Sequence, residues 1–173
     1  MRHSLFLILC VLLSPVTVAT AASPLEGRWR LDPAHSSALD GWTAWDLLIT
    51  VNGAEVTLQH DMQWRSTKVT GTNILNTTQP TTTRTFFRVD QRHMGVYPQK
   101  EAETSLRAHW LDAGRTLQLE ANTPVEISQG RTTMRLSSEY RVLEGNTSLL
   151  LIELHQSRPR PLVYRFTKVE EGK

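Results

Sequence analysis

An alternation of apolar and polar side chains on both sides of Asn52-Gly53, with Leu48 as the one apolar residue at a polar position, restricts the fold more than any other feature. Apolar residues occupy every second position from 45 to 51 and again from 56 to 64, and His60 is the one interruption. A period of two residues is typical of a strand with one buried face, and Asn-Gly is a strong signal for a two-residue hairpin loop. The segment therefore predicts an antiparallel hairpin in which position 51 faces 54 and Trp45 faces His60.

The rest of the chain repeats this alternation, and no segment has a helical period. Further strands are expected over 68–75, 85–89, 106–110, 117–121, 134–142, 148–156 and 162–169, with a polar connection at 79–83 and an irregular stretch at 91–103. A sheet of this kind must bury its apolar face, and no long amphipathic helix exists to cover it. Closing the sheet on itself buries that face and removes the edges. We therefore expect an all-β fold, an antiparallel up-and-down barrel of eight or nine strands.

The first 22 residues have the three parts of a secretory signal peptide. Met1-Arg2-His3 is basic, residues 5–13 are apolar and uncharged, and Ala19-Thr20-Ala21-Ala22 supplies small residues for cleavage. The apolar run is shorter than the roughly 20 residues that cross a bilayer. The sequence predicts a signal peptide over 1–22, a single barrel domain over 23–173 without a membrane span, and a periplasmic or secreted location.

Composition excludes several classes of function. The single cysteine, Cys10, lies in the signal peptide, so the mature chain lacks thiolate chemistry and Cys-ligated zinc. Lys and Arg number 19 against 17 Asp and Glu, and the arginines are scattered, so nucleic-acid binding is not expected. No catalytic, phosphate-binding or metal-ligand motif is present, so no cofactor, metal or catalytic residue is predicted. Four other histidines lack metal-type spacing and are expected to be solvated: His35, His93, His109 and His155.

The start of the predicted domain resembles that of secreted bacterial lipocalin-like domains, within the calycin group of β-barrels. The resemblance rests on Leu25-x-Gly27-x-Trp29-x-Leu31-Asp32-Pro33-Ala34-x-Ser36, and on an Asp112-Ala113-Gly114-Arg115-Thr116-Leu117 turn. It implies that Gly27 and Trp29 begin the first strand and that Trp29 plugs one end of the barrel. It also implies a basic residue of the last strand packed over the Trp29 ring, for which Arg165 and Lys168 are the candidates.

His60 is the most informative candidate for chemistry, because it lies on an otherwise apolar face. If that face lines a cavity, Trp45, Met62 and Trp64 would provide an apolar site in which His60 orients a small ligand. Alternatively, His60 is a core histidine whose hydrogen bonds are satisfied by a neighbour. Two functions remain open: a barrel that binds or carries a small apolar ligand in the cell envelope, and a filled barrel that acts as an interaction or inhibitor module through its loops, residues 91–103 above all.

Overall fold

The strands of the barrel account for nearly all of the regular structure. The computed structural model describes residues 22–37, 42–87, 96–99, 101–112 and 114–170, so the predicted signal peptide lies almost wholly outside the described residues. Within them are the strands β1 (Gly27–Asp32), β2 (Ala44–Asn52), β3 (Glu55–Trp64), β4 (Thr67–Asn76), β5 (Thr81–Thr83), β6 (Tyr97–Pro98), β7 (Thr104–Trp110), β8 (Thr116–Ile127), β9 (Gly130–Val142), β10 (Ser148–His155) and β11 (Leu162–Lys168).

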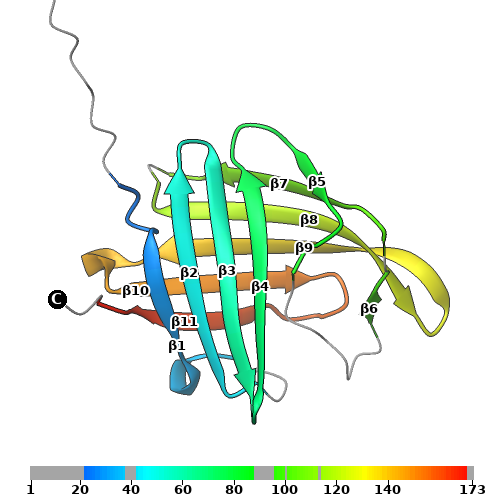
Figure 1. Cartoon of the computed structure of the whole chain (residues 1–173), viewed down its shortest axis with the longest axis horizontal. Coiled ribbons are helices and arrows are strands. Elements are labelled where there is room, and N and C mark those ends of the chain that lie inside the picture. The colour runs from blue at the N-terminus through cyan, green and yellow to red at the C-terminus, as the bar shows by residue number, and fades with distance from the viewer. Residues whose placement is uncertain (1–21, 38–41, 88–95, 100, 113, 171–173) are drawn as a thin grey trace, which may run out of the picture.

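All pairings are antiparallel, and they form one continuous path. The order is β4-β3-β2-β1-β11-β10-β9-β8-β7-β5, with β6 paired to β8. The first strand therefore lies beside the last. In Figure 1 the layer β1–β4 crosses the layer β7–β11 at a steep angle, and β4 approaches β7 where the path ends. The prediction of an all-β, up-and-down antiparallel barrel is confirmed.

The number of strands is higher than predicted, because two short strands fall in segments expected to be irregular. Residues 79–83, expected to be a polar connection, contain β5, and residues 91–103 contain β6. The strand expected over 85–89 is not formed at residues 85–87, and Val89 lies outside the described residues. Strands of two or three residues are too short to show an alternation that can be recognised from sequence.

The β2–β3 hairpin has a different register from the predicted one. The loop is Gly53–Ala54 instead of residues 52–53, and Trp45 therefore pairs with Met62 instead of His60. Gly53 has a φ of +58° and Ala54 is absent from the residues with positive φ, the pattern of a hairpin turn with glycine in its first central position. Each partner moves by two residues, which preserves the buried face because side chains alternate with a period of two.

The inward faces of the strands form one apolar core. Its largest fully buried side chains are Trp29, Trp45, Tyr164 and Phe166. Helical structure among the described residues is restricted to short 3-10 turns, η1 (Pro33–His35) and η3 (Glu144–Asn146). In this part of the chain no helix is long and apolar enough to cross a membrane.

Candidate functional site

A row of aromatic side chains crosses the interior from Phe87, beside β4, to β11, with His60 near its middle. The His60 ring centroid lies 5.5 Å from that of Trp45 and 5.2 Å from that of Phe87. Trp45 in turn meets Tyr164 and Phe166 edge-on, at centroid distances of 5.2 and 5.1 Å. These distances are typical of aromatic pairs that stabilise a core beyond simple burial. Although His60 and Trp45 are not paired across the hairpin, they meet diagonally, so the predicted contact between them exists.

Three buried nitrogen atoms in this row have no hydrogen-bond partner among the described residues. They are Nε1 of Trp45 and both ring nitrogens of His60. His60 is only 4% exposed, and burial lowers its pKa from 6.5 to about 4, an effect that Asp61 opposes. The imidazole is therefore neutral at pH 7 and offers one donor and one acceptor. Groups of this kind normally have partners when they are buried, so the row can accept hydrogen bonds from, and donate them to, a further molecule.

The other two residues predicted for the ligand site behave differently from each other. Met62 is buried and lies on the same face of β3 as His60. Trp64 is 41% exposed at the end of β3, where the Arg65 guanidinium lies 5.5 Å from its ring centroid. The structure therefore brings Trp45, His60 and Met62 together in the interior and leaves Trp64 at the surface.

Trp29 of the first strand and Lys168 of the last strand pack against each other, a contact that the resemblance implied. Trp29 is fully buried, and its Nε1 donates to the Leu25 carbonyl oxygen at 2.9 Å. The Lys168 ammonium lies 5.1 Å from the centroid of the Trp29 ring, within the range of a cation–π contact. Gly27 leaves room for this contact, since a Cβ there would lie 3.1 Å from Cε of Lys168. Arg165 lies across from Asp32, on the opposite face of β11 from its buried neighbours.

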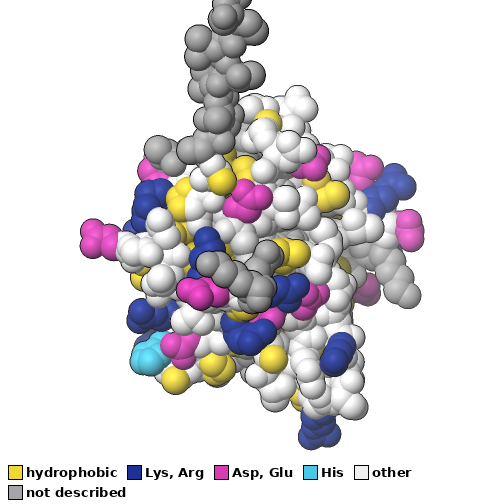
Figure 2. Space-filling view, turned by 60° about the vertical axis from the view of Figure 1, so that its left-hand side comes forward, with side chains coloured by type: hydrophobic (Ala, Val, Ile, Leu, Met, Phe, Trp, Pro, Cys, Tyr) yellow, Lys and Arg dark blue, Asp and Glu magenta, His cyan; other side chains and the backbone are white. Residues whose placement is uncertain are grey.

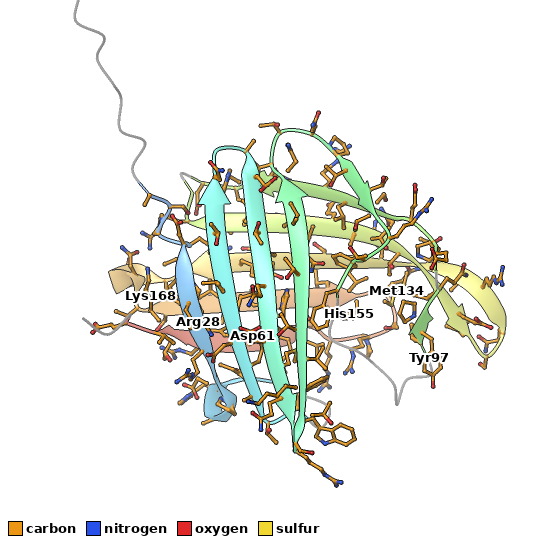
Figure 3. All side chains as sticks on the ribbon, viewed as in Figure 1. Arg28, Asp61, Tyr97, Met134, His155 and Lys168 are labelled. Carbon is orange, nitrogen blue, oxygen red and sulfur yellow. The ribbon has the colours of Figure 1, made fainter. Side chains whose placement is uncertain are left out.

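A second polar group lies inside the barrel on the β9–β10 side. His155 and Glu153 are both buried, and His155 Nε2 lies 3.3 Å from a Glu153 carboxylate oxygen. Burial, with a smaller contribution from the Glu153 charge, raises the pKa of Tyr140. The expectation that His155 is solvated was wrong, because this residue lies on the buried face of β10. Its labelled side chain lies on the rear layer in Figure 3. Alternation of β10, in which Leu149, Leu151 and Glu153 also point inward, was the signal that could have placed it.

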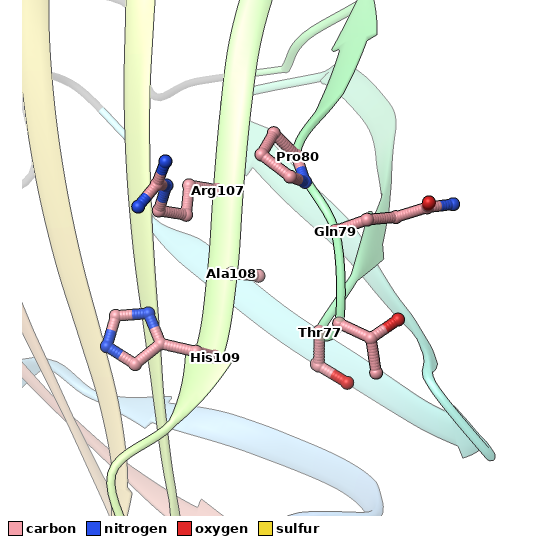
Figure 4. A pocket seen from close by; sticks show the side chains of 7 residues that line it. Thr77, Gln79, Pro80, Arg107, Ala108 and His109 are labelled. Carbon is pink, nitrogen blue, oxygen red and sulfur yellow. The ribbon is translucent and has the colours of Figure 1, made fainter.

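Among the described residues, the two ends of the strand path, β4 and β5, are not paired with each other. We call the junction between them the seam: β4 lies on one side, and β5, β7 and residues 84–87 lie on the other. A hollow of about 460 Å³ lies on the seam, lined by residues 70–72 of β4, 84–87, Pro98, Gln99 and Glu101. A second hollow of about 400 Å³ lies between residues 77–80 and β7. Arg107 and His109 project from the same side of β7 there (Figure 4). The first hollow shares Phe87 with the aromatic row.

The outward side chains of β1–β3 form an ion-pair network instead of a paired-carboxylate site. Asp46 binds Arg30 at 2.9 Å and Arg28 at 3.3 Å, and Asp61 lies 3.6 Å from Arg28 (Figure 3). The hydrogen bond from Arg30 is the largest of the effects that lower the pKa of Asp46. Basic and acidic side chains are interspersed on the face in Figure 2, which shows no patch of a single sign.

Comparisons with known proteins identify the fold. No protein-family model and no curated protein matches the sequence. Among solved structures, a secretory abundant heat soluble protein from Ramazzottius varieornatus matches with a TM-score of 0.53 and 12% identity, over 86% of this chain and 97% of that one. Apo lipid binding protein 8 from Caenorhabditis elegans matches with a TM-score of 0.54 and 11% identity, over 87% of this chain and 100% of that one. At these identities the likeness shows a shared β-barrel fold and no more.

Proposed function

We propose that this chain is an exported barrel that binds a small, mainly apolar ligand beside His60 and Trp45. The observation that carries the proposal is the set of three buried ring nitrogens without a partner among the described residues. Leaving one buried polar group unpaired costs about 1–3 kcal/mol. A ligand with one hydrogen-bonding group, bound at this point, would recover part of that free energy.

The surroundings of His60 favour an apolar ligand body. Trp45, Met62 and Phe87 present aromatic and thioether surface, which is adaptable and strongly hydrophobic. A barrel of about this size encloses side chains and one small ligand. One of the similar structures, lipid binding protein 8, is named for a lipid ligand, which suggests the same broad class of ligand here.

Export rests on the sequence of residues 1–22. The basic start, short apolar run and small-residue cleavage zone favour removal of this segment near Ala22. The resemblance of the following residues to secreted bacterial lipocalin-like domains favours release to the periplasm or the medium. Expression in a bacterial host tests this proposal, because the intact mass of the purified protein gives the cleavage point. A mass that still includes residues 1–22 would contradict it.

Native mass spectrometry tests the binding site. We expect the wild-type protein to carry or capture an apolar molecule, and His60→Leu to lose it while keeping the same far-ultraviolet circular dichroism spectrum. Leu58→Met is the matched control, since it changes a buried side chain on the same face of β3, outside the proposed site, without removing a polar group. It should retain the molecule.

The opposite result has a clear meaning. A wild-type protein that neither carries nor captures any apolar molecule, together with a His60→Leu variant that is only more stable, would identify a filled core. The function would then lie on the surface or in the loops.

A further inference from the structure

Phe87 occupies a space on the inner side of β4 that exists because position 71 is glycine. Gly71 pairs directly with His60 across the β3–β4 ladder. A Cβ atom on Gly71 would lie 2.1 Å from two ring carbons of Phe87, closer than real Cβ atoms approach any atom. The Phe87 ring therefore lies against bare backbone at the position where any other residue would place a side chain.

The ring of Phe87 is the neighbour of the unpartnered imidazole. The two ring centroids are 5.2 Å apart and the planes are tilted by 39°. A phenyl ring has no hydrogen-bonding atom, so it fills the space without satisfying either nitrogen of His60. A ring with a hydroxyl or N–H group at the same place could do both.

The segment that carries Phe87 is attached to the barrel by one side chain instead of a strand ladder. Nδ2 of Asn73 donates to the Phe87 carbonyl oxygen, and the Phe87 amide N–H donates to Oδ1 of Asn73, each at 2.7 Å. Asn73 is buried, and residues 85–87 belong to no strand. Because both bonds use backbone atoms of Phe87, the attachment does not depend on the phenyl ring.

The hollow of about 460 Å³ at the seam reaches both Gly71 and Phe87. Phe87 thus touches the open hollow as well as His60, which is almost fully buried. A molecule that enters from the hollow meets the Phe87 ring before it meets the imidazole.

We propose that the space over Gly71 is a subsite for a planar aromatic ring of the ligand, and that Phe87 fills this subsite until a ligand ring with one hydroxyl or N–H group displaces it and bonds to His60. The inference rests on the proposed function and names its ligand class. No covalent step is involved.

The matched probes are phenol and toluene, which have nearly the same shape and differ in hydrogen bonding. Each is titrated against the purified protein by calorimetry or by NMR. Phe87→Ala vacates the ring space and keeps the Asn73 attachment, so we expect it to bind phenol at least about ten-fold more tightly than wild type. It should also prefer phenol to toluene by about ten-fold. Adding His60→Leu should abolish the preference while toluene binding remains.

Phe86→Ala is the matched control. Phe86 lies in the same segment and lines the same hollow, whereas the rings that contact His60 within the described part of the chain are those of Trp45 and Phe87. We expect it to bind phenol as wild type does. If Phe87→Ala does not fold, Phe87→Leu, which vacates less space, should show the same preference with a smaller gain.

Several results would overturn the inference. Equal affinity for both probes in Phe87→Ala, or an equal gain in Phe86→Ala, would show that the substitution creates only a nonspecific apolar cavity. A wild-type protein that binds neither probe at millimolar concentration would show that Phe87 is a fixed core side chain. An aliphatic molecule found in the wild-type barrel, lost in His60→Leu and unaffected by Phe87→Ala, would refute the ring subsite and leave the proposed function intact.

Discussion

Replacing His60 by leucine should make the stability of the barrel less sensitive to acid. Burial lowers the pKa of His60 in the folded protein from 6.5 to about 4, whereas in the unfolded chain it keeps its ordinary value. Above pH 6.5 neither state binds a proton and the full stability is present. Between pH 6.5 and 4 the unfolded chain gains the proton first, so the wild-type free energy of unfolding falls as the pH falls.

Because the pKa falls from 6.5 to about 4 on folding, the free energy of unfolding of the wild type decreases by about 3 kcal/mol over the whole pH range. About 2 kcal/mol of this decrease occurs between pH 7 and pH 5. His60→Leu has no such group. At pH 7 it should already be more stable by about 1–3 kcal/mol, because it no longer buries unpaired nitrogens. Its advantage over the ligand-free wild type should then grow by about 2 kcal/mol between pH 7 and pH 5.

Urea denaturation at pH 7, 6, 5 and 4.5 measures this directly. Carboxylates with lowered pKa values, such as Asp46 beside Arg30, titrate in both proteins and cancel in the difference. His109→Leu is a control, since His109 is only partly buried on the outer side of β7. Parallel stability profiles for wild type and His60→Leu would refute the view that a buried neutral imidazole opposes acid stability here.

Two further predictions concern Trp29 and Gly27 of β1. Trp29→Ala should lower the free energy of unfolding by about 3–5 kcal/mol, because it removes a fully buried indole; an unchanged urea midpoint would show that Trp29 is not an anchor of the core. Gly27→Ala should lower the free energy of unfolding more than Gly130→Ala in the same assay. The two glycines have similar φ values, +125° and +121°, but only on Gly27 would an added Cβ meet a neighbour, Cε of Lys168 at 3.1 Å. Equal costs would show that Lys168 moves aside freely.

The sequence predicts the faces of the strands well and their pairing less well. Alternation assigns Leu47, Ile49 and Met62 to the buried side, as the structure has them. Alternation cannot distinguish a loop at residues 52–53 from one at 53–54, because the two registers differ by two residues and bury the same side chains. Only the backbone conformation of Gly53 distinguishes them.

The surroundings of His60 were only partly predictable for a similar reason. The hairpin pattern indicates that His60 points inward and lies near Trp45. Phe87 comes from a segment without a strand, and its position depends on Asn73 and Gly71 of β4. A glycine within a strand is compatible with close approach of another group, but the alternation pattern does not indicate which group approaches. The choice between Lys168 and Arg165 likewise required the β1–β11 pairing, in which Lys168 faces Trp29.

The polar groups of the interior differ in a way that bears on function. The barrel satisfies Nε1 of Trp29 with the Leu25 carbonyl oxygen, pairs His155 with Glu153, and joins the hydroxyls of Thr104 and Thr123 at 2.8 Å.

Trp45 and His60 are a tryptophan and a histidine, as are Trp29 and His155, and all four are buried. The ring nitrogens of Trp45 and His60 nevertheless have no hydrogen-bond partner within the described part of the chain. Because the barrel provides hydrogen-bond partners for Trp29 and His155, missing partners are not a general property of its interior. Of the two, His60 contacts Phe87, which lines the hollow at the seam. Unpaired ring nitrogens next to a side chain of this hollow support the proposal that a ligand enters at the seam.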